Sequence, residues 1–304
     1  MAITVNTNLS SMIVQSNLQK STQQLNTAIE RMTTGYKINR AADNAAGYSI
    51  ARNWEAQISS LDIAADNAAM GADMLSTLED NYALISSHVQ RVRDLTEQAA
   101  NGTYGEQSKK AIESEIQARL EEINRIALNC EYNGIKMMDG TNATAKSIQV
   151  GIDGTAAKSQ ITLSSDLFAD AKISALFNVT GEGAYTPTGA DEAAKLAQLA
   201  KDCAGTSTAA TPKKPTELLG TLDRVISRIS DRITTLGAAQ NRIESAIESI
   251  GVQSENITSS LSTLRDADVA TESSNYIKAQ ILQQASATLL ATANQSPSIA
   301  LNLL

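Results

Sequence analysis

Hydrophobic side chains recur at heptad spacing along the C-terminal part of the chain. Between residues 222 and 264 the positions follow alternating steps of four and three residues, and all but two of them carry hydrophobic side chains. These positions are Leu222, Ile226, Ile229, Ile233, Leu236, Gln240, Ile243, Ile247, Ile250, Ser254, Ile257, Leu261 and Leu264. A strict period of about 3.5 residues predicts a long helix that supercoils around a partner. The alternative, an amphipathic helix on a compact domain, favours a wider stripe with a period of about 3.6 residues.

A second stripe with steps of three and four residues lies upstream and predicts the partner helix. It consists of Ile58, Leu61, Ala65, Ala68, Ala72, Leu75, Leu78, Tyr82, Ile85, Val89, Val92, Leu95 and Ala99. A shorter stripe follows at Ile112, Ile116, Leu120, Ile123 and Ala127. The segment Asn101–Gly105 between the two is a natural reversal point. Three helices, two of them long, are therefore expected to form a bundle in which the stripes bury one another.

Turn-forming residues interrupt the region between these helices. Three of the four prolines and eleven of the sixteen glycines fall between residues 102 and 220. Asn133-Gly134 is a strong signal for a tight hairpin turn. The alternating residues 147–150 and 160–163 predict short strands. A small insert that contains β-hairpins is therefore expected before the last long helix.

Both ends of the chain combine an apolar stripe with very little charge. Residues 1–40 carry five charged side chains, and the 26 residues after Lys278 carry none. The apolar positions expected to make contacts are Leu18, Leu25, Ile29, Ile281, Leu282, Leu289 and Leu290. A solvated helix face normally carries Lys and Glu. We expect both ends to be loosely ordered in a free subunit and to become buried when copies associate, the alternative being two frayed tails.

The overall charge and composition exclude several classes of partner. Acidic residues number 33 against 25 basic ones, which gives a net charge of −8, and aromatic residues make up 3%. This balance disfavours a nucleic-acid surface, which needs clustered Lys and Arg. No apolar run is long enough to cross a membrane, and the start of the chain lacks the features of a secretory signal. We expect a cytosolic protein or one exported without a cleaved signal.

No set of residues in the sequence points to catalysis, a cofactor or a metal. His88 is the only histidine, so it has no partner for a metal cluster or a nucleophile pair. Cys130 and Cys203 lack the spacing of a redox or zinc motif and could pair or remain free. Asp266 and Asp268 are expected to end one helix and cap the next. The chain is therefore not expected to be an enzyme.

Ordered motifs at both ends resemble those of bacterial flagellin. They are Asn6–Ser10, Arg31–Gly47, Leu236–Arg242, Arg265–Asp268, Ala279–Ala285 and Ala293–Pro297. The resemblance implies a mainly α fold, a long coiled-coil bundle with paired N- and C-terminal helices and a small insert. The expected domains are a terminal core of residues 1–44 and 266–304, a bundle of 45–140 and 216–265, and a variable insert of 141–215.

The same resemblance implies a function and a set of partners. Flagellins polymerise into the extracellular filament of the bacterial flagellum, with the terminal helices lining the tube and the bundle forming its wall. Export then follows the flagellar type III route, with a chaperone that shields the C-terminal segment. The filament cap and the hook-associated proteins are further expected partners.

A receptor contact is also implied by the resemblance. The segment from Gln90 to Leu95 is similar to the region through which flagellin monomers bind Toll-like receptor 5. Gln90, Arg91, Leu95 and Glu115 are carried over as contact residues. The alternative is that Leu95 belongs to the bundle stripe and the charged residues are merely solvated.

Two other classes of protein compete with this interpretation. A hook–filament junction protein shares the terminal design but usually matches the Gln-Ala and Ala-Asn-Gln-Ser-Pro motifs less fully. A signalling coiled coil would carry charged outer faces, which the uncharged C-terminal residues speak against.

Overall fold

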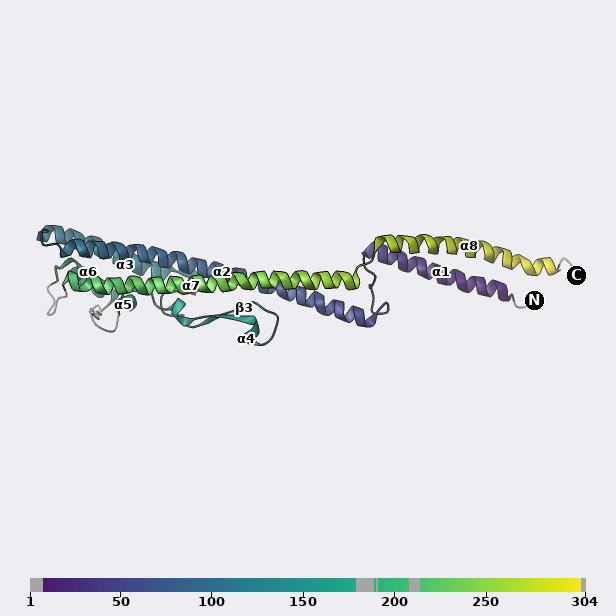
Figure 1. Cartoon of the computed structure of the whole chain (residues 1–304), viewed down its shortest axis with the longest axis horizontal. Helices are drawn as coiled ribbons and strands as arrows, with labels where there is room; N and C mark the ends of the chain where they lie inside the picture. Colours follow the sequence, from purple (N-terminus) through teal and green to yellow (C-terminus); the bar gives the residue numbers. More distant parts are fainter. Residues whose placement is uncertain (1–7, 179–188, 190, 208–213, 302–304) are drawn as a thin grey trace. The chain divides into compact units, whose positions relative to one another are not determined.

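A computed structural model describes residues 8–178, 189, 191–207 and 214–301 of the chain. The chain divides into two compact units, one of Met1–Ser59 with Gln253–Leu304 and one of Ser60–Val252. Two helices, α2 (Ala45–Ala100) and α7 (Pro215–Arg265), contribute to both units. The mainly helical fold with a small β insert confirms the predicted fold class (Figure 1).

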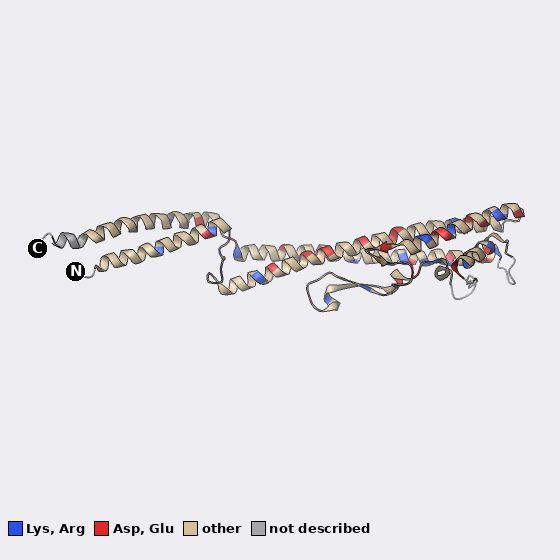
Figure 2. Cartoon of the chain, turned by 180° about the vertical axis from the view of Figure 1, so that it is seen from behind, with Lys and Arg blue, Asp and Glu red and all other residues tan. Residues whose placement is uncertain are grey.

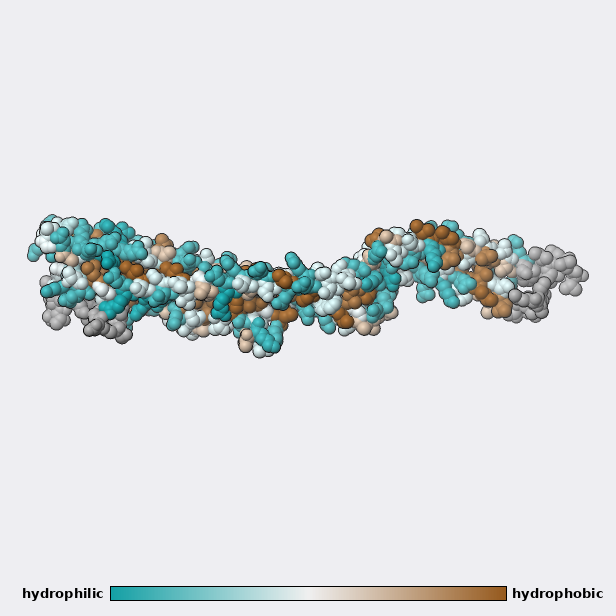
Figure 3. Space-filling model, viewed as in Figure 1, coloured by the Kyte–Doolittle hydropathy of each residue, from teal (hydrophilic) through white to brown (hydrophobic). Residues whose placement is uncertain are grey.

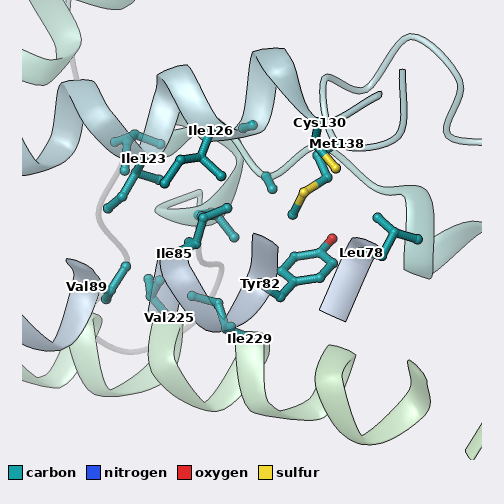
Figure 4. Close-up of a cluster of buried hydrophobic side chains, with 14 of the residues drawn as sticks. Leu78, Tyr82, Ile85, Val89, Ile123, Ile126, Cys130, Met138, Val225 and Ile229 are labelled. Atoms are coloured by element: carbon teal, nitrogen blue, oxygen red, sulfur yellow. The ribbon is translucent and has the colours of Figure 1, made fainter. Parts of the chain in front are cut away.

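The unit of residues 60–252 is a helical bundle built on the predicted stripes. In it, α2 and α7 pack with α3 (Glu106–Asn129), which begins after the predicted reversal at Asn101–Gly105. Leu78 and Tyr82 of α2, Ile123 of α3 and Ile229 of α7 belong to one buried cluster (Figure 4). From Leu222 to Ile250 every second heptad position of α7 is buried and those between are half-buried, whereas all four positions from Ser254 to Leu264 are half-buried. One of the two rows of stripe residues therefore lies in the core, and the other lies where the core meets the solvent.

The predicted hairpins form where turn chemistry allows them. Strands β1 (Glu131–Tyr132) and β2 (Ile135–Lys136) pair antiparallel around Asn133-Gly134, whose φ angles are 48° and 77°. Strands β3 (Lys146–Gln149) and β4 (Gln160–Leu163) form a second antiparallel pair, with Ile148 opposite Ile161. Ile148 packs against Gly71 of α2, where an added Cβ would lie 2.4 Å from its Cδ1 atom. The missing side chain of Gly71 thus makes room for this hairpin.

The insert contains more helix than the sequence pattern predicted. Its longest element is α6 (Glu192–Ala204), which packs along α3 and buries Leu196, Leu199 and Cys203. Asp191 caps the first turn of α6 by accepting from the amide of Ala194, and Gly205 ends it with a left-handed φ of 69°. The sequence predicted a short β and loop insert over residues 141–215, and α6 is an additional element that this pattern did not predict. The shorter elements are α4 (Ala156–Ser159), the 3₁₀ turn η1 (Ser165–Phe168) and α5 (Ile173–Leu176).

The four-residue helix α5 is held at both ends by other helices. Asn124 Oδ1 accepts from the amide of Ile173 at 2.9 Å, and Glu192 Oε1 accepts from the amide of Ser174 at 3.2 Å. At the other end Arg228 donates to the carbonyls of Ala175 and Leu176 at 3.3 and 3.2 Å. An acid near the helix start and a cation near its end both suit the helix dipole. The insert is thus tied to α3, α6 and α7.

The other unit is built on α1 (Leu9–Thr34) and α8 (Val269–Leu301), which lie side by side (Figure 1). They are antiparallel, since the start of α1 contacts the end of α8. The expected domain boundaries fall at the start of α2 and the end of α7. The compact unit extends further, to residues 59 and 253, so that the adjoining ends of α2 and α7 group with the terminal pair.

Candidate assembly surface

The two terminal helices meet through small and polar side chains. Ser21 and Ala28 of α1 and Ala279 and Ser286 of α8 are buried. Small residues let two helix backbones approach closely, but they bury little apolar area. The stabilisation gained is about 25 cal/mol for each Å² of apolar surface buried. Contact within the pair therefore contributes little hydrophobic stabilisation.

Hydrogen bonds supply much of the specificity of this pairing. Asn8 Nδ2 donates to the carbonyl of Ala293 at 2.7 Å, and Ser11 Oγ donates to Asn294 Oδ1 at 2.8 Å. At the opposite end Arg31 forms an ion pair with Glu272 at 3.1 Å. A typical hydrogen bond adds only about 0.5–1.5 kcal/mol net, so these contacts fix the register more than they stabilise the pair.

Many large apolar side chains of the pair remain exposed instead of packing in this interface. Ile281 and Leu289 of α8 are 59% and 56% exposed. The other exposed apolar residues are Leu9, Met12, Ile13, Ile29, Met32, Val269, Ile277 and Leu282, and Leu18, Leu25 and Leu290 are half-buried. Figure 3 shows brown apolar surface over this pair, and Figure 2 shows how few charges it carries. The arrangement leaves contiguous apolar side chains exposed on both helices, a feature that marks interaction sites in proteins.

The chain segments that enter and leave the pair are joined to each other. Tyr36 and Asp266 form an antiparallel bridge. The amide of Lys37 donates to the carbonyl of Arg265 at 2.7 Å, and the amide of Ala267 donates to the carbonyl of Gly35 at 2.8 Å. The Arg265 guanidinium lies 4.0 Å from the centroid of the Tyr36 ring and forms an ion pair with Glu55. Both connections of the terminal pair are therefore held in one register.

Asp266 and Asp268 have the roles expected from the sequence. The hydroxyl of Ser262 donates to Asp266 at 2.5 Å as α7 ends. Asp268 accepts from the amide of Ala270 at 3.0 Å and from the hydroxyl of Thr271 at 2.6 Å, which caps the start of α8.

The four residues expected at a receptor contact occupy two environments. Gln90 and Arg91 are exposed on α2, and the Arg91 guanidinium donates to Glu115 Oε1 of α3 at 2.9 Å. Arg119 lies 3.8 Å from the same carboxylate. Leu95 is only 1% exposed and belongs to the buried cluster. The structure thus brings Arg91 and Glu115 together and leaves Gln90 exposed on α2, whereas Leu95 lies in the core and is not available for contact.

The cysteines and the single histidine have surroundings that do not indicate catalysis. Cys130 and Cys203 are free and buried, and burial raises their thiol pKa values to about 11 and about 12. His88 lies against Arg119, and desolvation lowers its pKa. Among the described residues, no three His, Cys, Asp or Glu side chains are grouped to hold a metal ion. None of the described helices combines the length and apolar character needed for a membrane crossing.

Comparison with known proteins decides the family. A family model of the bacterial flagellin N-terminal helical region matches residues 5–143, and one of the flagellin C-terminal helical region matches residues 219–304. A flagellin of Xenorhabdus nematophila is 36% identical over 313 residues, which cover 100% of both chains. The chain belongs to the bacterial flagellin family. Flagellins are structural proteins of the extracellular flagellar filament and are not enzymes.

Other relatives of this flagellin also match along their full length. A flagellin of Listeria monocytogenes is 31% identical over 300 residues, which cover 99% of each chain. The flagellar filament 33 kDa core protein of Treponema phagedenis is 30% identical over 300 residues, again covering 99% of each. The solved structure of a flagellar hook-associated protein from Vibrio parahaemolyticus aligns with 74% of this chain and 100% of its own, at a TM-score of 0.58 and 16% identity. That likeness concerns the fold alone.

Proposed function

We propose that the outward apolar faces of the α1/α8 pair are the surfaces through which this flagellin polymerises. The supporting observation is the inverted arrangement of the pair, with small residues inside and Ile281, Leu289 and their neighbours outside. Each such side chain contributes about 1.5–3 kcal/mol when it becomes fully buried. Association of many copies therefore supplies the hydrophobic stabilisation that the isolated pair lacks.

Export is the second part of the proposal. The subunit leaves the cell through the flagellar type III apparatus, and a chaperone covers its C-terminal segment beforehand. The uncharged residues after Lys278 and the exposed apolar side chains of α8 support this, because such a surface needs a cover before assembly. The hook-associated proteins and the filament cap then contact the polymer at its two ends.

Recognition by Toll-like receptor 5 is the third part. Gln90, Arg91 and Glu115 offer the contact surface in the monomer, and Leu95 contributes by holding α2 in the bundle. The exposed Arg91–Glu115 pair presents both a guanidinium and a carboxylate to a partner. A hook–filament junction protein is disfavoured, because the full-length relatives above are filament proteins.

Polymerisation is tested with Ile281→Ser, which makes an exposed apolar position of α8 polar. We expect the critical concentration for filament formation to rise about tenfold, since roughly 1.4 kcal/mol of contact is lost per added subunit. Sedimentation and negative-stain electron microscopy measure it. Gln280→Ser is the matched control, because Gln280 is exposed on the same helix and already polar. An Ile281→Ser variant that polymerises like wild type contradicts the proposal.

Receptor binding is tested with Arg91→Ala and Glu115→Ala in the monomer. Each is expected to weaken affinity for the receptor by at least about fivefold, in line with the loss of about 1 kcal/mol or more at a contact residue. Arg125→Ala is the control, since Arg125 is an exposed arginine of α3 that pairs with Glu122 instead. Unchanged affinity in both test variants removes the receptor assignment.

A further inference from the structure

Two free cysteines lie inside the bundle, where neither the proposed assembly surface nor the proposed receptor contact uses them. Cys130 follows the last residue of α3, and Cys203 lies in the last turn of α6. The two residues are 3% and 0% exposed. Thiol–disulfide exchange proceeds through the thiolate, and burial disfavours the thiolate at both positions by raising the pKa. The folded subunit therefore protects both thiols from oxidation.

The packing of α6 on α3 places the two cysteines far apart. The helices are antiparallel, since the first residue of α6 accepts a hydrogen bond from Asn124 at 3.4 Å, whereas Thr206, just past the end of α6, donates to Glu113 at 2.6 Å. Cys203, three residues before Thr206, is therefore level with the third residue after Glu113. Cys130 lies 14 residues beyond that level, which corresponds to about 21 Å along the helix axis.

The long helix α2 gives the same separation independently. Cys130 lies near Tyr82 of α2 in the buried cluster (Figure 4). The thiol of Cys203 is hydrogen-bonded to the side chain of Thr96 of the same helix. Tyr82 and Thr96 are 14 residues apart, which again corresponds to about 21 Å. A disulfide needs Cα atoms within about 7 Å of each other, so the two cysteines cannot pair while α6 is docked.

We infer that this pair of cysteines makes the docking of α6 sensitive to oxidation. Both thiols are accessible in the unfolded chain, where a low-molecular-weight disulfide such as oxidised glutathione can join them. One protein thiolate attacks the glutathione disulfide and releases one glutathione thiol, and the second protein thiolate attacks the resulting mixed disulfide and releases the other. The two protein thiols thus lose two electrons and two protons, and one glutathione disulfide becomes two thiols.

The cross-linked chain cannot place α6 on α3. Twelve residues join Cys203 to Pro215 at the start of α7, and that length of extended chain spans up to about 40 Å. Cys203 can therefore reach Cys130 if α6 leaves its site, while α2, α3 and α7 still pack together. Leu196 and Leu199, which are buried in the reduced subunit, then lose their cover. The disulfide therefore selects a state in which α6 is undocked.

Oxidation before folding tests this inference on the monomer. The wild-type chain is unfolded in urea, treated with oxidised glutathione and returned to buffer, and mass spectrometry identifies the species with an intramolecular disulfide. Amides of α6 are expected to exchange at least about a hundredfold faster than in the reduced chain, because the helix has lost its buried contacts. Amides in the middle of α2 are expected to keep their protection. Dithiothreitol is expected to restore the protection of α6.

The double variant Cys130→Ala with Cys203→Ala is the matched control. It passes through the same treatment and is expected to exchange as it does without oxidant. The folded wild-type chain, given oxidised glutathione without urea, is expected to retain both thiols. A disulfide-bonded chain whose α6 amides are as protected as in the reduced chain overturns the inference, and so does an unfolded chain that forms no intramolecular disulfide. These measurements use the monomer, so their outcome is independent of the proposed polymerisation.

Discussion

At the scale of single residues, capping side chains decide where the helices begin and turn. Asp268 caps α8 through the Ala270 amide and the Thr271 hydroxyl. These hydrogen bonds, the one from the Thr271 hydroxyl having the larger effect, stabilise the ionised carboxylate and lower its pKa. Asp43 has a lowered pKa for a similar reason, because it accepts from the amides of Arg40 and Asn39. Both connections of the terminal pair therefore depend on ionised carboxylates.

This dependence predicts an effect of pH on the start of α8. A group whose pKa is lowered in the folded state contributes stability above its unfolded pKa of about 3.9, and the contribution is lost as the pH falls through the folded pKa. We expect amide protection in the first turn of α8 to decrease on acidification below about pH 4. Hydrogen exchange corrected for the intrinsic rate measures it. Asp268→Asn is the control, because Asn caps helices without titrating; an identical pH response in that variant speaks against the explanation.

Sequence reasoning was strongest where one residue acts on its own neighbours. The caps at Asp268 and the turn at Asn133-Gly134 depend on local backbone geometry, and both were predicted. Leu95 shows the limit, because its type suits a receptor anchor and a core position equally. Only the packing of α2 against the bundle distinguishes the two.

At the scale of elements, tertiary contacts decide whether a segment forms a helix when the sequence pattern alone does not predict one. The heptad stripes and the uncharged ends were visible in the sequence, whereas α6 was not predicted. Its signals were present in the Asp191 cap, the Gly205 stop and the apolar spacing between them. A helix of 13 residues is marginal on its own, however, and it forms here because α3 covers its apolar side.

The short helix α5 depends even more on its neighbours, which predicts a role for Arg228. Arg228→Leu leaves the carbonyls of Ala175 and Leu176 without their donor, so we expect the free energy of unfolding to fall by about 1–3 kcal/mol. Urea unfolding of the purified subunit measures the change. Arg242→Leu removes an exposed arginine from the same helix and is expected to have little effect. Equal losses in the two variants would show that Arg228 does not hold α5.

At the scale of the whole molecule, the two units differ in how they are stabilised. The unit of residues 60–252 has a continuous apolar core formed from α2, α3, α6, α7 and the insert. The terminal pair instead buries few apolar residues and exposes many. Local stability follows the buried apolar contacts of a region. The pair is therefore expected to open more easily than the bundle in a free subunit.

Hydrogen exchange of the monomer and the polymer tests this difference. Amides of α1 and α8 are expected to exchange quickly in the monomer and to become at least about a hundredfold slower in the polymer, as assembly buries their apolar faces. Amides of α3 serve as the internal control, because the bundle covers them in both states. Strong protection of α1 and α8 in the monomer would contradict the expected loose order of the ends.

The antiparallel arrangement of α1 and α8 also has a kinetic consequence. The hydrogen bond from Asn8 to Ala293 joins residues 285 positions apart, so the terminal pair has nearly the highest contact order that the chain allows. A polypeptide that passes through a narrow channel from either end releases its two termini at different times. On the proposed export route the first terminus to emerge has to wait for the last, so we expect this pair to be the final part of the subunit to fold.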